Sequence, residues 1–274
     1  DSSSNTNTGI AGSDVSLASS GGKFDSYSID EKATLLTAAE ADGYATNSGS
    51  NYAYGNGAGT FKFVHDGSPF SIAFWVYRNG TTSGTEPCYL DTNGTSTSNV
   101  GFSLFAPDNT SAGNIRFFMS NGSALTTAIN STLTNQTWTH IVITHSTGDD
   151  YLRMYKDGTQ VGSGVDLSGY SHSTANAYTS LNVLRNSARG SMTVCSISDL
   201  GFWEDHVLST GDITKLKDGT RITDDGTGFD YSSSNITHHY PFFTDTNDDK
   251  GSHNLTNSSL TFGTTASPTA SIST

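Results

Sequence analysis

The sequence predicts an all-β fold, an antiparallel sandwich with one short helix. Segments rich in β-forming residues are separated by turn residues roughly every 10 to 15 positions, the spacing that an antiparallel sandwich requires. Hardly any segment shows the period of an amphipathic helix. Aromatic residues reach 11% of a chain in which hydrophobic residues make up only 33%. We therefore expect Phe, Tyr and Trp rings to fill the space between two sheets.

Four strands are predicted between consecutive turn signals. The turn dipeptides are Asn79-Gly80, Asn93-Gly94, Pro107-Asp108 and Asn121-Gly122. Gly and Asn tolerate the backbone conformations that tight turns need, which is why they end β runs. The strands are expected over residues 71–78, 86–91, 100–106 and 114–119.

Two hairpins are also predicted. Residues 140–144 and 151–155 are rich in β-formers, and the Gly148-Asp149-Asp150 break turns the chain back between them. A second tight turn is expected at Asp157-Gly158. Further upstream, four aromatic residues alternate across a Gly-rich loop, which suggests another hairpin; they are Tyr52, Tyr54, Phe61 and Phe63.

The helix is predicted over residues 210–217. Ser209 or Thr210 can cap its first turn, and Asp212 lies near its positive end. Its buried stripe would consist of Leu208, Ile213 and Leu216. Residues 31–41 leave two alternatives open, a short helix or a strand through residues 33–36.

Three segments, taken in order, carry a resemblance to a known family. They are FSIAFWVY at 70–77, WTHIVITHSTGDDYLRMYKDG at 138–158, and a closing unit that runs from MTVCSISDLGFW at 192–203 to LSTGDITKL at 208–216. Over roughly residues 60 to 220 the chain resembles the laminin-G-like, concanavalin A-like family of lectins and glucanases. The resemblance implies a jelly-roll sandwich, and it says much less about function because one fold hosts many functions.

We expect one domain, residues 29–263, between a low-complexity N-terminal arm (1–28) and a flexible tail (264–274). Residues 239–262 resemble the family's opening motif, although they follow the core instead of preceding it. This order indicates either a circularly permuted domain or a truncated second repeat. Permutation is favoured because the termini of a domain often lie close together.

The charge balance limits the partners. Acidic residues number 26 against 13 Lys and Arg, giving a net charge of −13. The sequence contains no cluster of basic residues that could bind along a phosphate backbone. Nucleic acid is therefore excluded as a partner. No apolar run approaches the ~18 residues that span a bilayer. An acidic, hydroxyl-rich surface suits cation binding and an extracellular or virion-surface setting.

No catalytic site is expected. A retaining glycosidase needs two carboxyl groups about 5 to 5.5 Å apart, commonly from two glutamates a few residues apart on one strand face. The chain's four glutamates are Glu31, Glu40, Glu86 and Glu204, and no two have that spacing. The protein is therefore predicted not to be an enzyme.

An acidic loop predicts a calcium site. Asp245, Asp248 and Asp249 supply hard oxygen ligands within one loop, and Gly251 allows the bend that such loops need. Within the resemblance, Asp249 matches an Asp of the family's opening motif, and Asp199 matches the Asp of a later strand. These four aspartates are the predicted calcium ligands, with a solvated acidic turn as the alternative.

The histidines and cysteines give weaker signals. His140 and His145 lie five apart on one hairpin strand, and His238 and His239 are adjacent, so the spacing does not favour a zinc site. Cys88 and Cys195 both lie in predicted strands. They form either a disulfide between the two sheets in an oxidising compartment or a pair of buried free thiols.

A sugar-stacking platform would use aromatic residues in loops, because the three tryptophans lie in strands and are expected in the core. The candidates are Tyr52, Tyr54, Tyr170 and Tyr178. Within the resemblance, the closing segment FWEDHVLSTGDITKL is closest to lectin-like domains on bacteriophage and other virus particles.

The resemblance implies a non-catalytic virion-surface protein that decorates capsids or fibres, contacts other virion proteins or its own copies, and engages glycans. The alternatives are a secreted or cell-surface carbohydrate-binding module or adhesin, and a glycoside hydrolase of the same fold.

Overall fold

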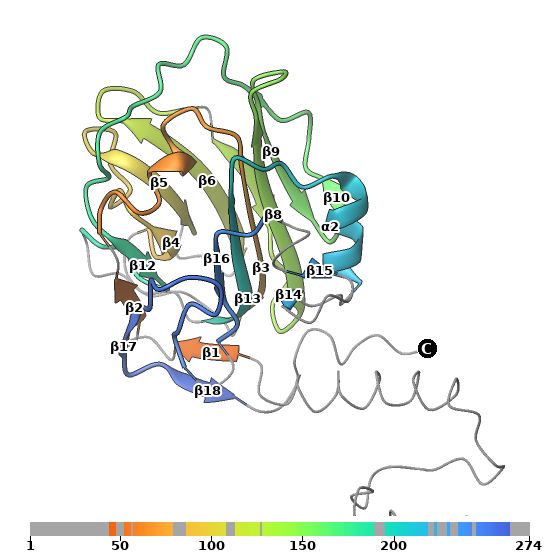
Figure 1. Cartoon of the computed structure of the whole chain (residues 1–274). Coiled ribbons are helices and arrows are strands. Elements are labelled where there is room, and N and C mark those ends of the chain that lie inside the picture. Colours follow the sequence, from red (N-terminus) through yellow and green to blue (C-terminus); the bar gives the residue numbers. More distant parts are fainter. Residues whose placement is uncertain are drawn as a thin grey trace, which may run out of the picture.

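The computed structural model describes residues 44–47, 52–55, 57–78, 86–107, 113–126, 128–188, 195–218, 222–223, 229–230, 235–242 and 245–263. Two large antiparallel sheets face each other in this part of the chain (Figure 1). The predicted all-β jelly-roll sandwich is confirmed. The predicted arms at 1–28 and 264–274, and the open alternatives for residues 31–41, lie outside the described residues.

The larger sheet contains nine strands. Along its main path these are β10 (Thr159–Gln160), β9 (Tyr151–Lys156), β8 (Trp138–Ser146), β3 (Phe70–Arg78), β13 (Cys195–Glu204), β1 (Tyr44–Asn47) and β18 (Thr261–Gly263). In addition, β11 (Val165–Asp166) pairs with β9, and β16 (His238–Tyr240) pairs with β13. The hairpin predicted at residues 140–155 is the β8–β9 pair, in which Ile143 lies opposite Met154.

The second sheet contains seven strands. Their order is β17 (Thr256–Ser258), β2 (Tyr52–Gly55), β12 (Leu181–Val183), β4 (Cys88–Asp91), β5 (Val100–Phe105), β6 (Asn114–Asn121) and β7 (Ile129–Thr132). A separate parallel pair consists of β14 (Ile222–Thr223) and β15 (Phe229–Asp230). The strands predicted between the turn dipeptides correspond to β3, β4, β5 and β6.

The hairpin predicted across the Gly-rich loop is wrong. Its first half is strand β2, but β2 pairs with β12 and β17. Its second half is a single turn of 3₁₀ helix, η2 (Lys62–Val64). The rings of Phe61 and Phe63 are both buried, and Phe61 lies 4.6 Å from Phe202 between ring centroids. The alternation of Phe61 and Phe63 arises because both rings enter the core from a turn. Their spacing of two residues mimics the pattern of a strand.

The space between the two sheets forms the main core. The nine-stranded sheet supplies Phe74 and Phe202, and the seven-stranded sheet supplies Phe102 and Phe117; all four side chains are fully buried. Burial of each large ring removes apolar surface from water, at about 25 cal/mol per Å². Aromatic rings therefore fill the space between the two sheets, as the sequence predicts.

Helix α2 (Thr210–Lys217) covers the outer face of the nine-stranded sheet (Figure 1). Of the two predicted caps, Ser209 is the one used: its side chain accepts a hydrogen bond from the Asp212 amide, and the Asp212 carboxylate accepts one from the Ser209 amide. Ile213 and Leu216 pack with Trp203 in a second core cluster. No described helix is long and apolar enough to cross a membrane.

The C-terminal segment adds strands to both large sheets. Strand β16 pairs with β13 and β18 pairs with β1 in the larger sheet, whereas β17 pairs with β2 in the smaller one. Residues 238–263 thus contribute to the same sandwich as the strands that precede them.

Candidate functional site

Asp248 is the most buried of the four predicted calcium ligands, and both of its carboxylate oxygens accept hydrogen bonds from the protein. Oδ1 accepts hydrogen bonds from the amides of His239 (3.0 Å), Lys250 (3.2 Å) and Gly251 (3.0 Å), and Oδ2 lies 2.8 Å from Nδ1 of His238. Burial alone would raise the pKa of Asp248, but these hydrogen bonds bring it below its usual value. The carboxylate therefore anchors the turn that follows it.

Asp199 lies apart from Asp248. It occupies the bulge in β13 with φ 53°, and its Oδ1 lies 2.7 Å from Nε2 of His239. His238 and His239 are consecutive on β16, so their side chains leave opposite faces of the sheet. The two carboxylates consequently contact opposite faces of the nine-stranded sheet.

The remaining two predicted ligands also stay separate. Asp245 is exposed and accepts hydrogen bonds from the amide (2.9 Å) and side chain (2.7 Å) of Asn247. Asp249 is exposed. Among the described residues, neither of these, nor Asp199, belongs to a group of three or more ligand atoms close enough to share a metal. The structure does not assemble the predicted calcium set.

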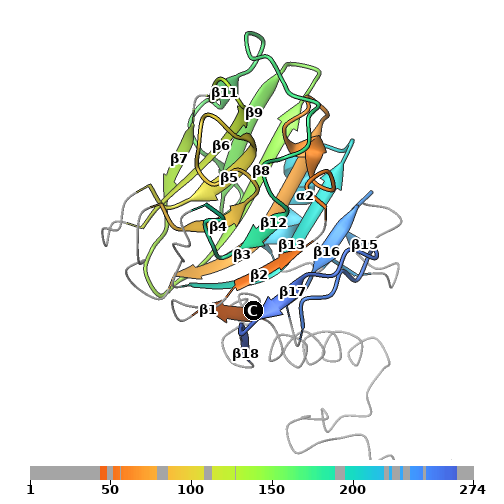
Figure 2. The same cartoon turned by 90° about the vertical axis from the view of Figure 1, so that its left-hand side faces the viewer.

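Two of the four predicted glycan-stacking tyrosines lie together. Tyr52 and Tyr54 project from the outer face of β2, with ring centroids 5.5 Å apart, whereas the intervening Ala53 is fully buried. The Arg185 guanidinium lies 4.3 Å from the centroid of the Tyr52 ring. The Tyr54 side chain is 39% exposed. Figure 2 shows their strand β2 flanked by β12 and β17. We call Tyr52, Tyr54 and Arg185 the tyrosine platform.

Asp91 holds the loop that carries Arg185. This aspartate is fully buried at the end of β4, and its Oδ2 accepts hydrogen bonds from the amide (2.8 Å) and hydroxyl of Ser187. Its Oδ1 accepts from the amides of Asn93 (3.1 Å) and Gly94 (2.8 Å). The Ser103 hydroxyl also donates to Oδ1, and a buried carboxylate with five donors is well compensated. It fixes the position from which Arg185 reaches Tyr52.

The other two tyrosines are not part of this platform. Tyr170 is half-buried against His172, and burial raises its pKa to about 12. Tyr178 is 55% exposed on the loop between β11 and β12. Within the described residues, neither ring contacts Tyr52 or Tyr54.

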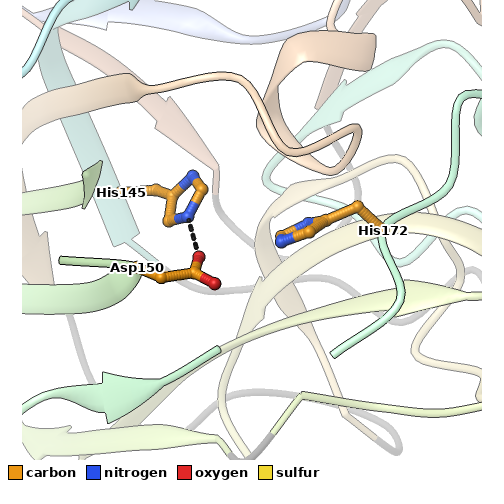
Figure 3. A group of neighbouring side chains, drawn as sticks. All are labelled: His145, Asp150 and His172. Atoms are coloured by element: carbon orange, nitrogen blue, oxygen red, sulfur yellow. Dashed lines mark hydrogen bonds and ion pairs between the residues drawn. The ribbon is translucent and has the colours of Figure 1, made fainter. Parts of the chain in front are cut away.

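The structure brings together histidines that the sequence pattern kept apart. His145 lies near the end of β8, Asp150 precedes β9, and His172 comes from the loop between β11 and β12; one ligand atom from each lies within 4.8 Å of the others. Figure 3 shows His172 directed at the His145–Asp150 pair. The distance from His145 Nε2 to Asp150 Oδ1 is 3.1 Å. Burial lowers the pKa of His172, and His145 lowers it further.

A second group consists of His238, Asp248 and His253, again with one ligand atom each within 4.8 Å. The His238 and His253 rings meet edge to face, with centroids 4.9 Å apart. Both histidine groups were missed from sequence, which instead predicted that the histidines would not converge. Only His145 and Asp150 carried a local signal, because residues on either side of a tight turn face each other.

Cys88 and Cys195 are buried free thiols in the structure. Of the two alternatives that the sequence left open, this is the unbridged one. Burial raises the pKa of Cys195 far above its usual range. A protonated, inaccessible thiol is unreactive, so Cys195 contributes to packing only.

Comparison with known proteins identifies the family. The sequence profile of the concanavalin A-like lectin/glucanases superfamily matches residues 44–214, more than half of the chain. The chain belongs to this superfamily. No curated protein is significantly similar to it in sequence.

Solved structures are similar to the chain at low sequence identity. A "putative carbohydrate binding protein" from Bacteroides ovatus has 14% identity and a TM-score of 0.57, and the match covers 82% of this chain but 61% of the other. The heptameric SAP-like pentraxin from Limulus polyphemus has 13% identity and a TM-score of 0.47, with 85% and 99% of the two chains covered. The likeness to the Bacteroides protein shows the fold alone.

The superfamily contains both lectins and glucanases, so membership alone does not show whether the chain is an enzyme. Glu86 precedes β4 in the seven-stranded sheet, whereas Glu204 ends β13 in the other sheet. Burial raises the pKa of Glu204, and neighbouring Asp205 raises it further. The other two glutamates lie outside the described residues.

Proposed function

We propose that the protein is a non-catalytic carbohydrate-binding module and that the tyrosine platform is its sugar-binding surface. The observation that carries the proposal is the Tyr52–Tyr54 pair on the outer face of β2, in which Tyr54 is exposed and Arg185 lies beside Tyr52. Tyrosine rings stack on the apolar face of a sugar while their hydroxyls, and a guanidinium, bind its oxygens. The Bacteroides protein with this fold is described as a putative carbohydrate binding protein, which also supports a sugar-binding function.

Arg185 favours a ligand with acidic groups. Its guanidinium lies beside the Tyr52 ring, and a guanidinium binds carboxylates in a bidentate manner. The chain as a whole carries a charge of −13, so long-range attraction would not draw an anionic glycan to it. Such a ligand would depend on this local cation.

A glycan array followed by titration calorimetry tests the proposal. Replacing Tyr54 with alanine removes one stacking ring, and we expect binding of the array's best ligand to weaken by about fivefold, or about 1 kcal/mol. Leu125→Ala is the matched control, because Leu125 is 41% exposed on the segment between β6 and β7, at the other end of the seven-stranded sheet. Equal affinity of the Tyr54 variant and wild type would place binding elsewhere.

The calcium requirement predicted from the sequence stays a prediction, and the same array measures it. Binding is compared in buffer with added Ca²⁺ and in buffer with a chelator. A ligand bound equally in both buffers would contradict a calcium-dependent mode.

We also propose that the module acts on a virion surface or in another extracellular setting. The support is compositional: acidic residues outnumber basic ones 26 to 13, which suits a solvated surface that does not bind nucleic acid. Mass spectrometry of purified particles and of secreted fractions from the source tests this, and recovery only from the cell interior would contradict it.

A further inference from the structure

We propose that His145, Asp150 and His172 bind one Zn²⁺ ion that ties the β8–β9 hairpin to the loop between β11 and β12. The site is independent of the tyrosine platform. It combines two imidazoles and one carboxylate, the ligand types that Zn²⁺ accepts, whereas Ca²⁺ takes six to eight oxygen ligands.

In its neutral form, His145 presents a lone pair to a carboxylate. Its Nδ1 lies 2.9 Å from the carbonyl oxygen of Ser68, which can only accept, so Nδ1 carries the proton. In the neutral ring Nε2 is then an acceptor, and it lies 3.1 Å from another acceptor, Oδ1 of Asp150. A cation between them satisfies both. A metal-binding histidine typically donates its other N–H to a backbone carbonyl in this way.

His172 is held in place to supply the third ligand. Its ring packs against Gly67, where an added Cβ would lie 3.2 Å from Cγ of the ring, and it meets Tyr170 edge to face at 5.0 Å. Its Nδ1 is buried without a hydrogen-bond partner among the described residues. Ligands about 2.1 Å from tetrahedral Zn²⁺ lie about 3.4 Å apart. The ligand atoms already lie within 4.8 Å of one another. To bind Zn²⁺, His172 would therefore move toward the other two ligands by no more than about 1.4 Å.

An ion can reach this group from solvent. The side chain of His145 is 1% exposed, but that of Asp150 is 36% exposed, so Asp150 lies on the open side. Three protein ligands leave a fourth position for water.

The second histidine group is a poorer candidate. Both oxygens of Asp248 already accept hydrogen bonds from His238 and from backbone amides. Gly251 also lies against this group, because a Cβ there would be 2.7 Å from Oδ2 of Asp248. Little room remains for an ion.

Calorimetric titration of the untagged full chain with ZnCl₂ tests the proposal, with thermal unfolding in the presence and absence of Zn²⁺ as a second readout. Asp150→Asn is the main variant, because φ at this residue is 54° and asparagine tolerates that conformation. Asp149→Asn is the matched control: it lies in the same turn, changes the charge equally, and affects an exposed pair with Arg153 and the hydrogen bonds of the carboxylate with Ser146 and the Tyr151 backbone. His172→Gln removes the ligand that comes from the other loop.

Wild type and Asp149→Asn are expected to bind one Zn²⁺ at this site and to unfold at a higher temperature with it. Asp150→Asn and His172→Gln should bind at least about 100-fold more weakly, since loss of an outer-shell partner alone costs about 10- to 100-fold. Failure of wild type to bind Zn²⁺ would overturn the proposal. So would wild-type affinity in both ligand variants, or loss of binding on His253→Gln alone. Glycan binding is measured separately, so either proposal can fail without the other.

Discussion

Buried His140 is expected to make the protein unstable in acid. It lies on the outer face of the nine-stranded sheet, 2% exposed, with its ring 4.9 Å from that of Trp75. Burial lowers the pKa of His140 to about 4; nearby Asp199 opposes the shift and Lys217 adds to it. In the unfolded chain a histidine takes up its proton near pH 6.5. Between these values the unfolded state binds more protons, so stability falls as the pH falls.

The size of the effect follows from the shift. The free energy of unfolding does not change through His140 above about pH 6.5. Below that value it falls progressively down to pH 4, by up to about 1.4 kcal/mol per pH unit. Between pH 7.5 and 4.5 this amounts to about 2.5 kcal/mol of unfolding free energy. That is a large part of the 5 to 15 kcal/mol that stabilises a typical domain. His140→Phe keeps a ring against Trp75 and cannot titrate, so it should lack this loss.

Urea denaturation at pH 7.5 and 4.5, at constant ionic strength, measures the difference. Acid effects from other groups are shared by wild type and variant and cancel when the two losses are subtracted. His140→Gln, which is also non-titrating, guards against a packing defect specific to phenylalanine. The reasoning is refuted if both variants lose as much stability between the two pH values as wild type does.

Three further predictions concern packing and anchoring. Cys88 and Cys195 should react with a thiol reagent such as dithiobis(nitrobenzoate) only when the protein unfolds, and rapid labelling of Cys195 in the native state would contradict its burial. Ser209→Ala removes the cap of α2 and should cost about 1 kcal/mol in urea denaturation. Asp91→Asn turns an NH₂ group toward hydrogen-bond donors and should cost about 1 to 3 kcal/mol. It should also weaken glycan binding because the loop of Arg185 loosens, and an unchanged urea midpoint would rule out the anchoring role.

Elements whose signals are local were predictable from the sequence. The β8–β9 hairpin carries its strands and turn within a few residues, and the cap of α2 needs only Ser209 and Asp212. Each of these segments has one conformation that satisfies its backbone and buries its apolar side chains. The Phe61–Phe63 alternation failed because a period of two can also arise when a turn inserts two rings into the core.

The candidate sites depended on contacts between distant segments. The predicted calcium set combined loop aspartates with Asp199, which the family resemblance added; the bulge in β13 and the alternation of β16 place Asp199 and Asp248 on opposite faces. Of the tyrosines, Tyr52 and Tyr54 are two apart on one strand and therefore share a face. Tyr170 packs against His172, two residues away, but on a loop where no strand alternation fixes the side-chain directions.

Counting donors and acceptors distinguishes the two carboxylates that contact histidines. Asp248 receives three backbone amides and the N–H of His238, so its demand for hydrogen bonds is met by the protein and its charge stabilises a turn. Asp150 instead faces the nitrogen of His145 that has no proton to give in the neutral ring, because the other nitrogen has donated to Ser68. An acidic residue becomes a plausible metal ligand when its neighbours also present lone pairs. On this criterion the hairpin turn is where this sandwich would hold the proposed Zn²⁺ ion.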